Sequence, residues 1–383
     1  MADPPQSATL QLTLDRLRRV QATLERRVAG RDPANIRHVG FAPQRAARVP
    51  TQRSAPERLA TELTGKELTG KELTGKELTD SPSSATLPVT AQFDVKRKRQ
   101  RLPADERIES VESIRLLERA SRTFLTLDLD TDVLQTGEIL PTGVRIENGA
   151  NHATTSAVVR WTQVEPAPAI RNLEDAQDFR WRWGVLTVAH LFNNPQGTNG
   201  GARVERLVTC GVGPQTIRGQ MVARGRVPGG PDISLIETGL DRLWLSGLLP
   251  QPDGPSLATA SETQLLDWIA TGTEGTYIGD GATHRWRWQT FYPELSISQL
   301  GRLRHVIRYR STVSQTDDAS PFGPGSSGGV LVAGGIPIGI QIAATSPLFQ
   351  DAFAQCFDVS LAWLKNQLRA TALDLVHLPL GSA

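Results

Sequence analysis

Two serines that lie between glycines are the residues of this chain whose types and spacing most directly suggest chemistry. The stretch FGPGSSGGVLV, residues 322–332, places Ser326 and Ser327 directly before an apolar run. A serine hydroxyl is a weak nucleophile unless a nearby base takes its proton, so a nucleophile here requires a histidine from elsewhere in the chain. The same composition is typical of a flexible connector. The loop alone leaves both interpretations open.

A histidine and an aspartate precede this loop, each beside a strand-like apolar run. LTVAH ends such a run at His190, and PDISL begins another at Asp232. His190 precedes Asp232 by 42 residues, and Asp232 precedes Ser327 by 95 residues. Taken singly, a strand-end histidine and an aspartate after a proline are ordinary structural residues. In this order they supply the three groups of a base-activated nucleophile.

The three stretches resemble the signatures of the trypsin/chymotrypsin-like serine protease family. That family has a strand ending in the histidine, a strand beginning at the aspartate, and a G-D-S-G-G loop at the serine. The resemblance covers roughly residues 146–370, and VSLAWLK at 359–365 is similar to the helix that closes such domains. It implies an all-β fold of two antiparallel Greek-key β-barrels with a C-terminal helix and a site in the cleft between the barrels.

The resemblance also implies a role for each residue. Ser327 would be the nucleophile and His190 its base, while Asp232 would orient the imidazole. The backbone N–H groups of Gly325 and Ser327 would form the oxyanion hole. The flanking glycines match the family pattern only if Ser327, and not Ser326, is the nucleophile. The resemblance predicts a serine endopeptidase that needs no metal and no cofactor.

The chain departs from the family at the substrate pocket. Pro321 stands six residues before Ser327, where trypsin-like members carry an aspartate. We therefore expect Pro321 and Phe322 to form a small or apolar pocket rather than one for lysine or arginine. Asp317 and Asp318 are close enough in sequence to change this expectation if the loop bends toward the pocket.

Further departures concern the triad, the disulfides and activation. Asp241 is a second candidate for the third catalytic group, although no apolar strand follows it. Leu191 and Gly323 occupy positions that are often half-cystines in secreted members, so those bridges are absent, and whether Cys210 pairs with Cys356 stays open. Arg145-Ile146 resembles an activation site. Since Ser326 offers no charge to a freed amine, we expect a site formed without cleavage.

The front of the chain differs in composition from the rest. Residues 1–100 hold 18 Lys and Arg against 11 Asp and Glu, and they contain no Trp or Tyr. Such composition is typical of a tail attached to a folded domain. We expect a partly disordered, partly helical extension before the protease domain. The predicted segments are a basic low-complexity extension over 1–103, with an amphipathic helix at 8–29 and a pentapeptide-repeat spacer at 61–80, then a helical connector at 104–124 and a protease domain at 125–383.

Short apolar runs separated by glycine, proline and asparagine fill the chain from about residue 125. Runs of this length and spacing predict an antiparallel sandwich or barrel, independently of any family. The six histidines are scattered and neither cysteine has a C-x-x-C neighbour, so the pattern gives no metal site. No run approaches 18 apolar residues and no signal peptide is visible, so we expect a cytoplasmic protein without a membrane span.

Several partners and functions stay open on the sequence. The leading partner is a protein or peptide substrate. The helix at 8–29 could pack on its own chain or form a self-associating coiled coil, and the basic run KRKRQR at 96–101 could contact nucleic acid, although a solvated charge cluster is the simpler interpretation. The alternatives to a general endopeptidase are a protease that acts mainly on itself and a catalytically inactive, protease-like binding module.

Overall fold

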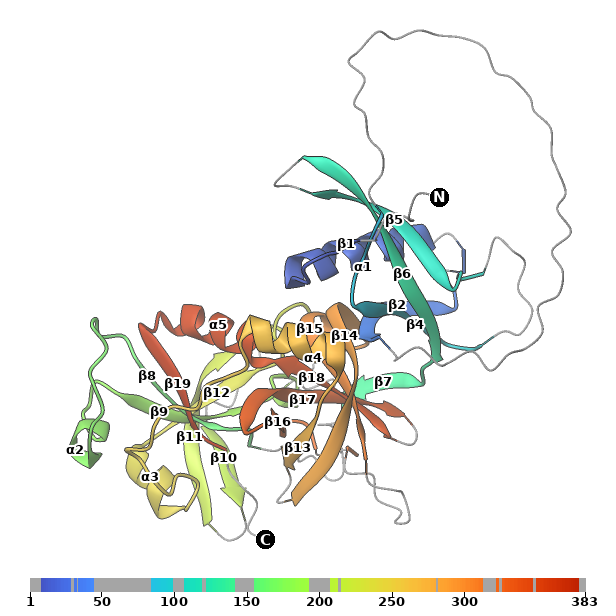
Figure 1. Cartoon of the computed structure of the whole chain (residues 1–383). Helices are drawn as coiled ribbons and strands as arrows, with labels where there is room; N and C mark the ends of the chain where they lie inside the picture. The colour runs from blue at the N-terminus through green and yellow to red at the C-terminus, as the bar shows by residue number, and fades with distance from the viewer. Residues whose placement is uncertain are drawn as a thin grey trace, which may run out of the picture.

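The computed structural model describes most of the chain in segments. The described residues are 8–28, 31–32, 34–44, 84–98, 107–118, 122–141, 155–192, 207–212, 215–279, 282–312, 322–323, 326–346 and 349–378. The pentapeptide spacer at 61–80 and the Arg145-Ile146 pair lie outside them. The architecture is mostly β-sheet with few helices (Figure 1). In the described part of the chain, no helix is both long and apolar enough to cross a membrane.

The front of the chain builds a unit of its own, with one helix and several strands (Figure 1, blue to teal). Within the range predicted to be helical, α1 spans Leu14–Val28. Leu17, Val20 and Leu24 are fully buried, so the apolar face of α1 is already covered by its own chain. The strands of the unit are β1 Ala8–Thr9, β2 Ile36–Pro43, β3 Ser84–Thr86, β4 Val89–Val95, β5 Val111–Glu118 and β6 Thr123–Gln135.

The helical connector predicted over 104–124 is wrong. Val111–Glu118 forms strand β5, which pairs antiparallel with β6 over its whole length. Glu112, Ile114 and Leu116 are buried while their neighbours face solvent, which is the period-two pattern of a half-buried strand. The low-complexity description of 1–103 also missed β2 and β4. The basic composition of this region obscured two short runs rich in β-branched and aromatic residues.

Six strands in the second half of the chain pair into a closed ring. The order is β14-β13-β16-β17-β18-β15, and β15 pairs again with β14. These strands are β13 Glu274–Gly279, β14 Ala282–Ile297, β15 Gly301–Ser311, β16 Val330–Ala333, β17 Ile336–Ser346 and β18 Asp351–Cys356. Every pairing within the ring is antiparallel.

A second sheet of six strands has the order β10-β11-β12-β9-β8-β19. Its strands are β8 Val158–Thr162, β9 Arg182–Thr187, β10 Leu207–Val212, β11 Gln215–Arg224, β12 Ser234–Thr238 and β19 Ala372–His377. Beside these strands lie α2 Leu173–Ala176, α3 Leu240–Leu245 and α5 Phe357–Leu368, and α5 contains the VSLAWLK stretch. The remaining helix, α4 Glu262–Thr271, packs instead against β2 of the front unit and β14 of the ring. One apolar cluster joins this sheet to the ring, with Val188 and Leu235 on one side and Val330 and Ile342 on the other.

The front unit is joined to the ring by strand pairing and by buried polar groups. β2 pairs with β14 at Phe41 and Phe291, and this links both parts into one 13-stranded sheet. Asp94 on β4 is fully buried and accepts a hydrogen bond from Arg308 on β15 at 3.2 Å. A short strand, β7 Glu138–Pro141, follows β6 and pairs with β17 of the ring. The front unit is therefore packed onto the ring rather than tethered to it.

Candidate active site

Strands β9 and β12 bring His190 and Asp232 together. The two strands pair antiparallel, with Ser234 opposite Thr187. His190 begins a short 3-10 turn three residues after the end of β9, and Asp232 stands two residues before the start of β12. Both residues therefore lie at the same end of this strand pair. Both are buried, with exposed fractions of 3% for His190 and 0% for Asp232.

The Asp232 carboxylate fixes the position of the His190 ring. Its Oδ2 lies 2.5 Å from His190 Nδ1, and its Oδ1 accepts the backbone N–H groups of Ala189 and His190 at 2.8 Å each. An ionised carboxylate can only accept, so Nδ1 carries a proton and Nε2 is left as the basic nitrogen. The backbone N–H of Asp232 donates to Gln355 Oε1 on β18 at 2.9 Å, which anchors the pair to the ring.

The second nitrogen of His190 is buried and has no hydrogen-bond partner among the described residues. A buried polar atom without a partner is uncommon, and in a native protein such an atom often marks a functional site. Arg224 on β11 adds positive charge near Asp232. Burial lowers the pKa of Arg224, and the Asp232 carboxylate opposes this effect. The arrangement presents a fixed imidazole with a basic nitrogen available to a further group.

The serine loop is tied to β17 and to Tyr277. Gly328 N–H donates to the Gln341 carbonyl at 2.9 Å, and Gln341 N–H donates to the Gly329 carbonyl at 2.8 Å. The Tyr277 hydroxyl donates to the carbonyl of Ser326 at 2.6 Å. Gly328 has a φ of 99°, and a Cβ on Gly329 would lie 2.2 Å from the Tyr277 ring. Glycine is therefore required at both positions, one for the backbone angle and one for space.

The two serines of the loop differ in their surroundings. The Ser326 hydroxyl donates to the Gly323 carbonyl at 2.7 Å, and it accepts from the Gln341 side chain. The Ser327 hydroxyl donates to the Ile342 carbonyl on β17 at 3.3 Å, and Ser327 is fully buried. Ser326 thus belongs to the turn, while the Ser327 hydroxyl makes a longer bond to the neighbouring strand.

The other predicted site residues have mixed outcomes. Gly325 and Pro321 lie outside the described residues, so the oxyanion hole and half of the pocket stay predictions. Phe322 is fully buried and its ring packs edge-on against Tyr277 and Tyr309, with centroids 5.5 and 5.0 Å away. Its part in a pocket also stays a prediction. Asp317 and Asp318 are likewise outside the description.

Asp241 and the cysteines can be placed more fully. Asp241 lies in the first turn of α3, which follows the end of β12, whereas Asp232 precedes the start of β12. The carboxylate that contacts His190 is that of Asp232, so Asp241 is not its partner. Cys356 is a free, buried thiol, and burial raises its pKa well above the usual value. The side chain of Cys210 lies outside the description.

Three residues that support the site were missed by sequence reasoning. They are Gln355, which holds Asp232, and Gln341 and Tyr277, which hold the serine loop. Each comes from a different strand of the ring. An isolated glutamine or tyrosine in an apolar run carries no signal that it will meet a loop many residues away.

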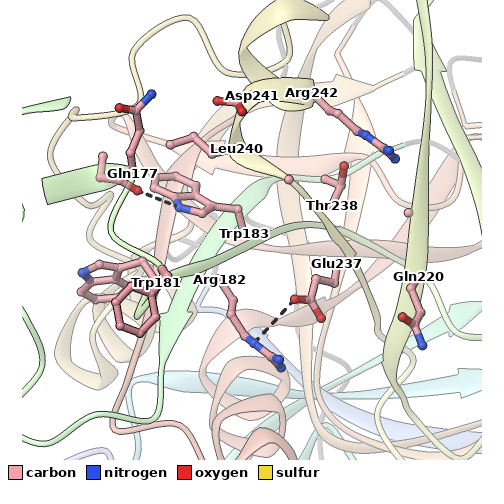
Figure 2. A pocket seen from close by; sticks show the side chains of 14 residues that line it. Gln177, Trp181, Arg182, Trp183, Gln220, Glu237, Thr238, Leu240, Asp241 and Arg242 are labelled. Atoms are coloured by element: carbon pink, nitrogen blue, oxygen red, sulfur yellow. Dashed lines mark hydrogen bonds and ion pairs between the residues drawn. The ribbon is translucent and has the colours of Figure 1, made fainter. Parts of the chain in front are cut away.

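A hollow of about 710 Å³ lies elsewhere, between β9, β12, α2 and α3 (Figure 2). Trp181, Trp183 and the Arg182–Glu237 ion pair line it, with Arg182 Nε 3.6 Å from the glutamate oxygen. Trp183 and Thr238 stand opposite each other at the ends of β9 and β12 farthest from His190 and Asp232. This hollow is therefore separate from the candidate active site.

Comparison with known proteins gave matches in structure only. No protein-family model matches the sequence, and no curated protein matches it. Several similar solved structures are serine proteases of the trypsin/chymotrypsin fold. The active form of the Rv3671c protease from M. tuberculosis is 17% identical, with 60% of this chain and 87% of that chain covered at a TM-score of 0.30.

Two further matches are of the same kind. Cellulomonas bogoriensis chymotrypsin is 17% identical over 51% of this chain and 86% of that chain, with a TM-score of 0.30. The Nocardiopsis protease NAPase is 14% identical over 63% of this chain and 97% of that chain, with a TM-score of 0.31. These TM-scores are low and carry no argument about function, so the contacts between His190 and Asp232 are the observation to build on.

Proposed function

We propose that this chain is a serine endopeptidase with a chymotrypsin-like arrangement of two Greek-key barrels. Ser327 is the nucleophile, His190 the general base and Asp232 the residue that orients it. The observation that carries the proposal is the His190–Asp232 pair, in which both carboxylate oxygens are used and Nε2 is left without a described partner. Such a pair is what an adjacent serine needs to become a nucleophile.

The proposed reaction follows from these groups. Ser327 Oγ attacks the carbonyl carbon of a peptide bond while His190 Nε2 takes the hydroxyl proton. Backbone N–H groups of Gly325 and Ser327 stabilise the negative oxygen of the tetrahedral intermediate. His190 then gives its proton to the leaving amine, which leaves an acyl ester on Ser327. Water, activated by the same histidine, attacks the ester and releases the second product.

One observation favours the non-catalytic alternative, a protease-like binding module. The Ser327 hydroxyl donates to the Ile342 carbonyl and is fully buried. In the active protein this hydroxyl has to turn from Ile342 toward His190 Nε2. A site that never makes this change would bind peptides without cutting them. Ser327 reactivity separates the two functions.

The test is labelling of the full-length protein with a fluorophosphonate, which reacts with activated serine hydroxyls. We expect labelling that is lost in Ser327→Ala and in His190→Ala. Ser326→Ala is the matched control, since it removes the neighbouring hydroxyl of the same loop, and it should keep the labelling. Equal labelling of wild type and Ser327→Ala would contradict the proposal.

A further inference from the structure

Strand β7 occupies a particular edge of β17. The pairing is antiparallel, with Pro141 opposite Ala343 and Glu138 opposite Ser346. Ala343 and Ala344 also pair with β18, so β7 lies on the other side of β17. β16 pairs with this same side of β17, but at residues that come earlier in β17. β7 therefore continues the position of β16 along the same edge of β17.

The contacts along this edge run in an unbroken series. Val330 of β16 is opposite Ile340, and Gly328 N–H donates to the carbonyl of Gln341. The Ser327 hydroxyl contacts the carbonyl of Ile342. The pairing with β7 starts at the next residue of β17, Ala343, which lies opposite Pro141. The strand edge directly beside the proposed nucleophile is thus already paired with an extended peptide from the same chain.

Ile139 inserts its side chain at this edge. It is buried, with 5% of its surface exposed, and it belongs to the apolar cluster that contains Val188, Val330 and Ile342. Val188 directly follows β9 of the other sheet and lies two residues before His190. An extended peptide on this edge therefore buries a branched aliphatic side chain in the apolar cluster that joins the second sheet to the ring, while Glu138 faces solvent.

The approach to β7 is anchored in the front unit. Gly137 comes so near β17 that a Cβ on it would lie 2.6 Å from the Ser346 carbonyl oxygen. Its own carbonyl accepts from Arg37 at 2.8 Å. Thr136 donates to Asp94 at 3.0 Å and accepts from Arg308 at 3.1 Å. The strand is held on β17 by residues of both the front unit and the ring.

We infer that β7 is a resident pseudosubstrate: Glu138–Pro141 occupies the edge of β17 on which peptide substrates bind, and it withholds that edge from them. Backbone pairing to a free strand edge is a general mode of peptide recognition, with side-chain pockets giving the selectivity. The inference rests on the proposed endopeptidase function. It also names the substrate class, an extended peptide with a branched aliphatic residue at the position of Ile139.

The test displaces β7 in the full-length protein. Gly137→Val introduces a side chain where Ser346 leaves no room, and Ile139→Asp places a charge in an apolar cluster. Ile139→Ala is a milder version that retains the fold more securely. Glu138→Gln, on the same strand but exposed, is the matched control. Amide hydrogen exchange of residues 343–346 reports whether β7 has left, and exchange in β9 and β12 reports whether the fold is intact.

The expected result is a gain of reactivity when β7 leaves. In the displaced variants we expect fluorophosphonate labelling of Ser327 to become about ten-fold faster or more. The reason is that the fraction of molecules whose β17 edge is free of β7 is small in wild type and large in these variants. Glu138→Gln should label like wild type. A synthetic peptide TGEILP, residues 136–141, should slow labelling of the displaced variants, and a scrambled peptide should not.

Two outcomes would overturn the inference in different ways. In the first outcome, wild type is labelled, hydrogen exchange shows that β7 has left β17 in the variants, and the variants are labelled at the wild-type rate. The inference that β7 is a pseudosubstrate is then wrong, while the proposed function stands. If neither wild type nor the displaced variants label while β9 and β12 stay protected, the proposed function fails and the inference fails with it.

Discussion

At the residue scale, the Asp232 carboxylate has two tasks. One oxygen meets the His190 ring at 2.5 Å, and the other holds the backbone of Ala189 and His190. The backbone contacts keep the turn after β9 in place, and the ring contact selects the tautomer. A change that keeps the shape of the side chain but removes an acceptor therefore separates the structural task from the chemical one.

Asp232→Asn makes this change. We expect the variant to fold, because an amide oxygen can still accept the two backbone N–H groups. An amide nitrogen facing Nδ1 would stabilise the wrong tautomer, and we expect the labelling rate of Ser327 to fall by about 10⁴-fold. The measurement is the rate of fluorophosphonate labelling in wild type and variant. Asp241→Asn, on the helix α3, is the control and should label normally; equal losses in both variants would refute the assigned role.

At the element scale, the sequence predicted some strands and missed others for physical reasons. The apolar runs around LTVAH and PDISL were readable because they end at polar residues: LTVAH begins in the last two residues of β9, and PDISL leads into β12. The stretch around Val111–Glu118 carries many charged residues, so spacing suggested a helix where pairing with β6 makes a strand. The pairing of β7 with β17 joins residues about 200 positions apart along the sequence and has no local signature.

The contact between β2 and β14 leads to a prediction about pH. His38 on β2 packs edge-on against Tyr292 of β14, with ring centroids 6.5 Å apart. Burial, together with the charge of Arg37, lowers the pKa of His38 from 6.5 to about 4. In the unfolded chain this residue gains a proton below pH 6.5, whereas in the folded chain it gains one only near pH 4. The stability it contributes is present above pH 6.5 and is lost as the pH falls toward 4.

His38→Gln removes this titration. Between pH 7 and pH 4 we expect the free energy of unfolding of the variant to fall by about 2–3 kcal/mol less than that of wild type. Urea denaturation of both proteins at several pH values measures the difference. Parallel curves for the two proteins would show that His38 does not carry this pH dependence.

At the scale of the whole molecule, buried charges join the front unit to the ring. Arg308 is 2% exposed and contacts Asp94 from the front unit and Asp351 from β18. Tyr292 donates to Asp94 at 2.5 Å. Burial raises the pKa of Asp94, and the charge of Arg308 opposes this effect. Thr136, two residues before β7, hydrogen-bonds to the same Asp94 and Arg308, so we expect the position of the front unit to affect the pairing of β7 with β17.

Asp94→Ala breaks this cluster by removing one partner of a buried ion pair. We expect a loss of about 3–5 kcal/mol in the free energy of unfolding, because Arg308 keeps its charge with one carboxylate fewer. Asp94→Asn keeps the shape and some of the hydrogen bonds, and it should lose less. Urea denaturation compares the two variants with wild type. An Asp94→Ala protein as stable as wild type would show that the cluster does not hold the front unit.

We propose above that Ser327 is a nucleophile activated by His190, whose ring is oriented by Asp232. The most direct measurement is mass-spectrometric mapping of the residue modified by a fluorophosphonate, made on wild type and on the Gly137→Val variant in which β7 is displaced. We expect a single adduct on Ser327, absent when His190 is replaced by alanine. An adduct on Ser326 or on another residue, or one that forms equally without His190, would contradict this proposal.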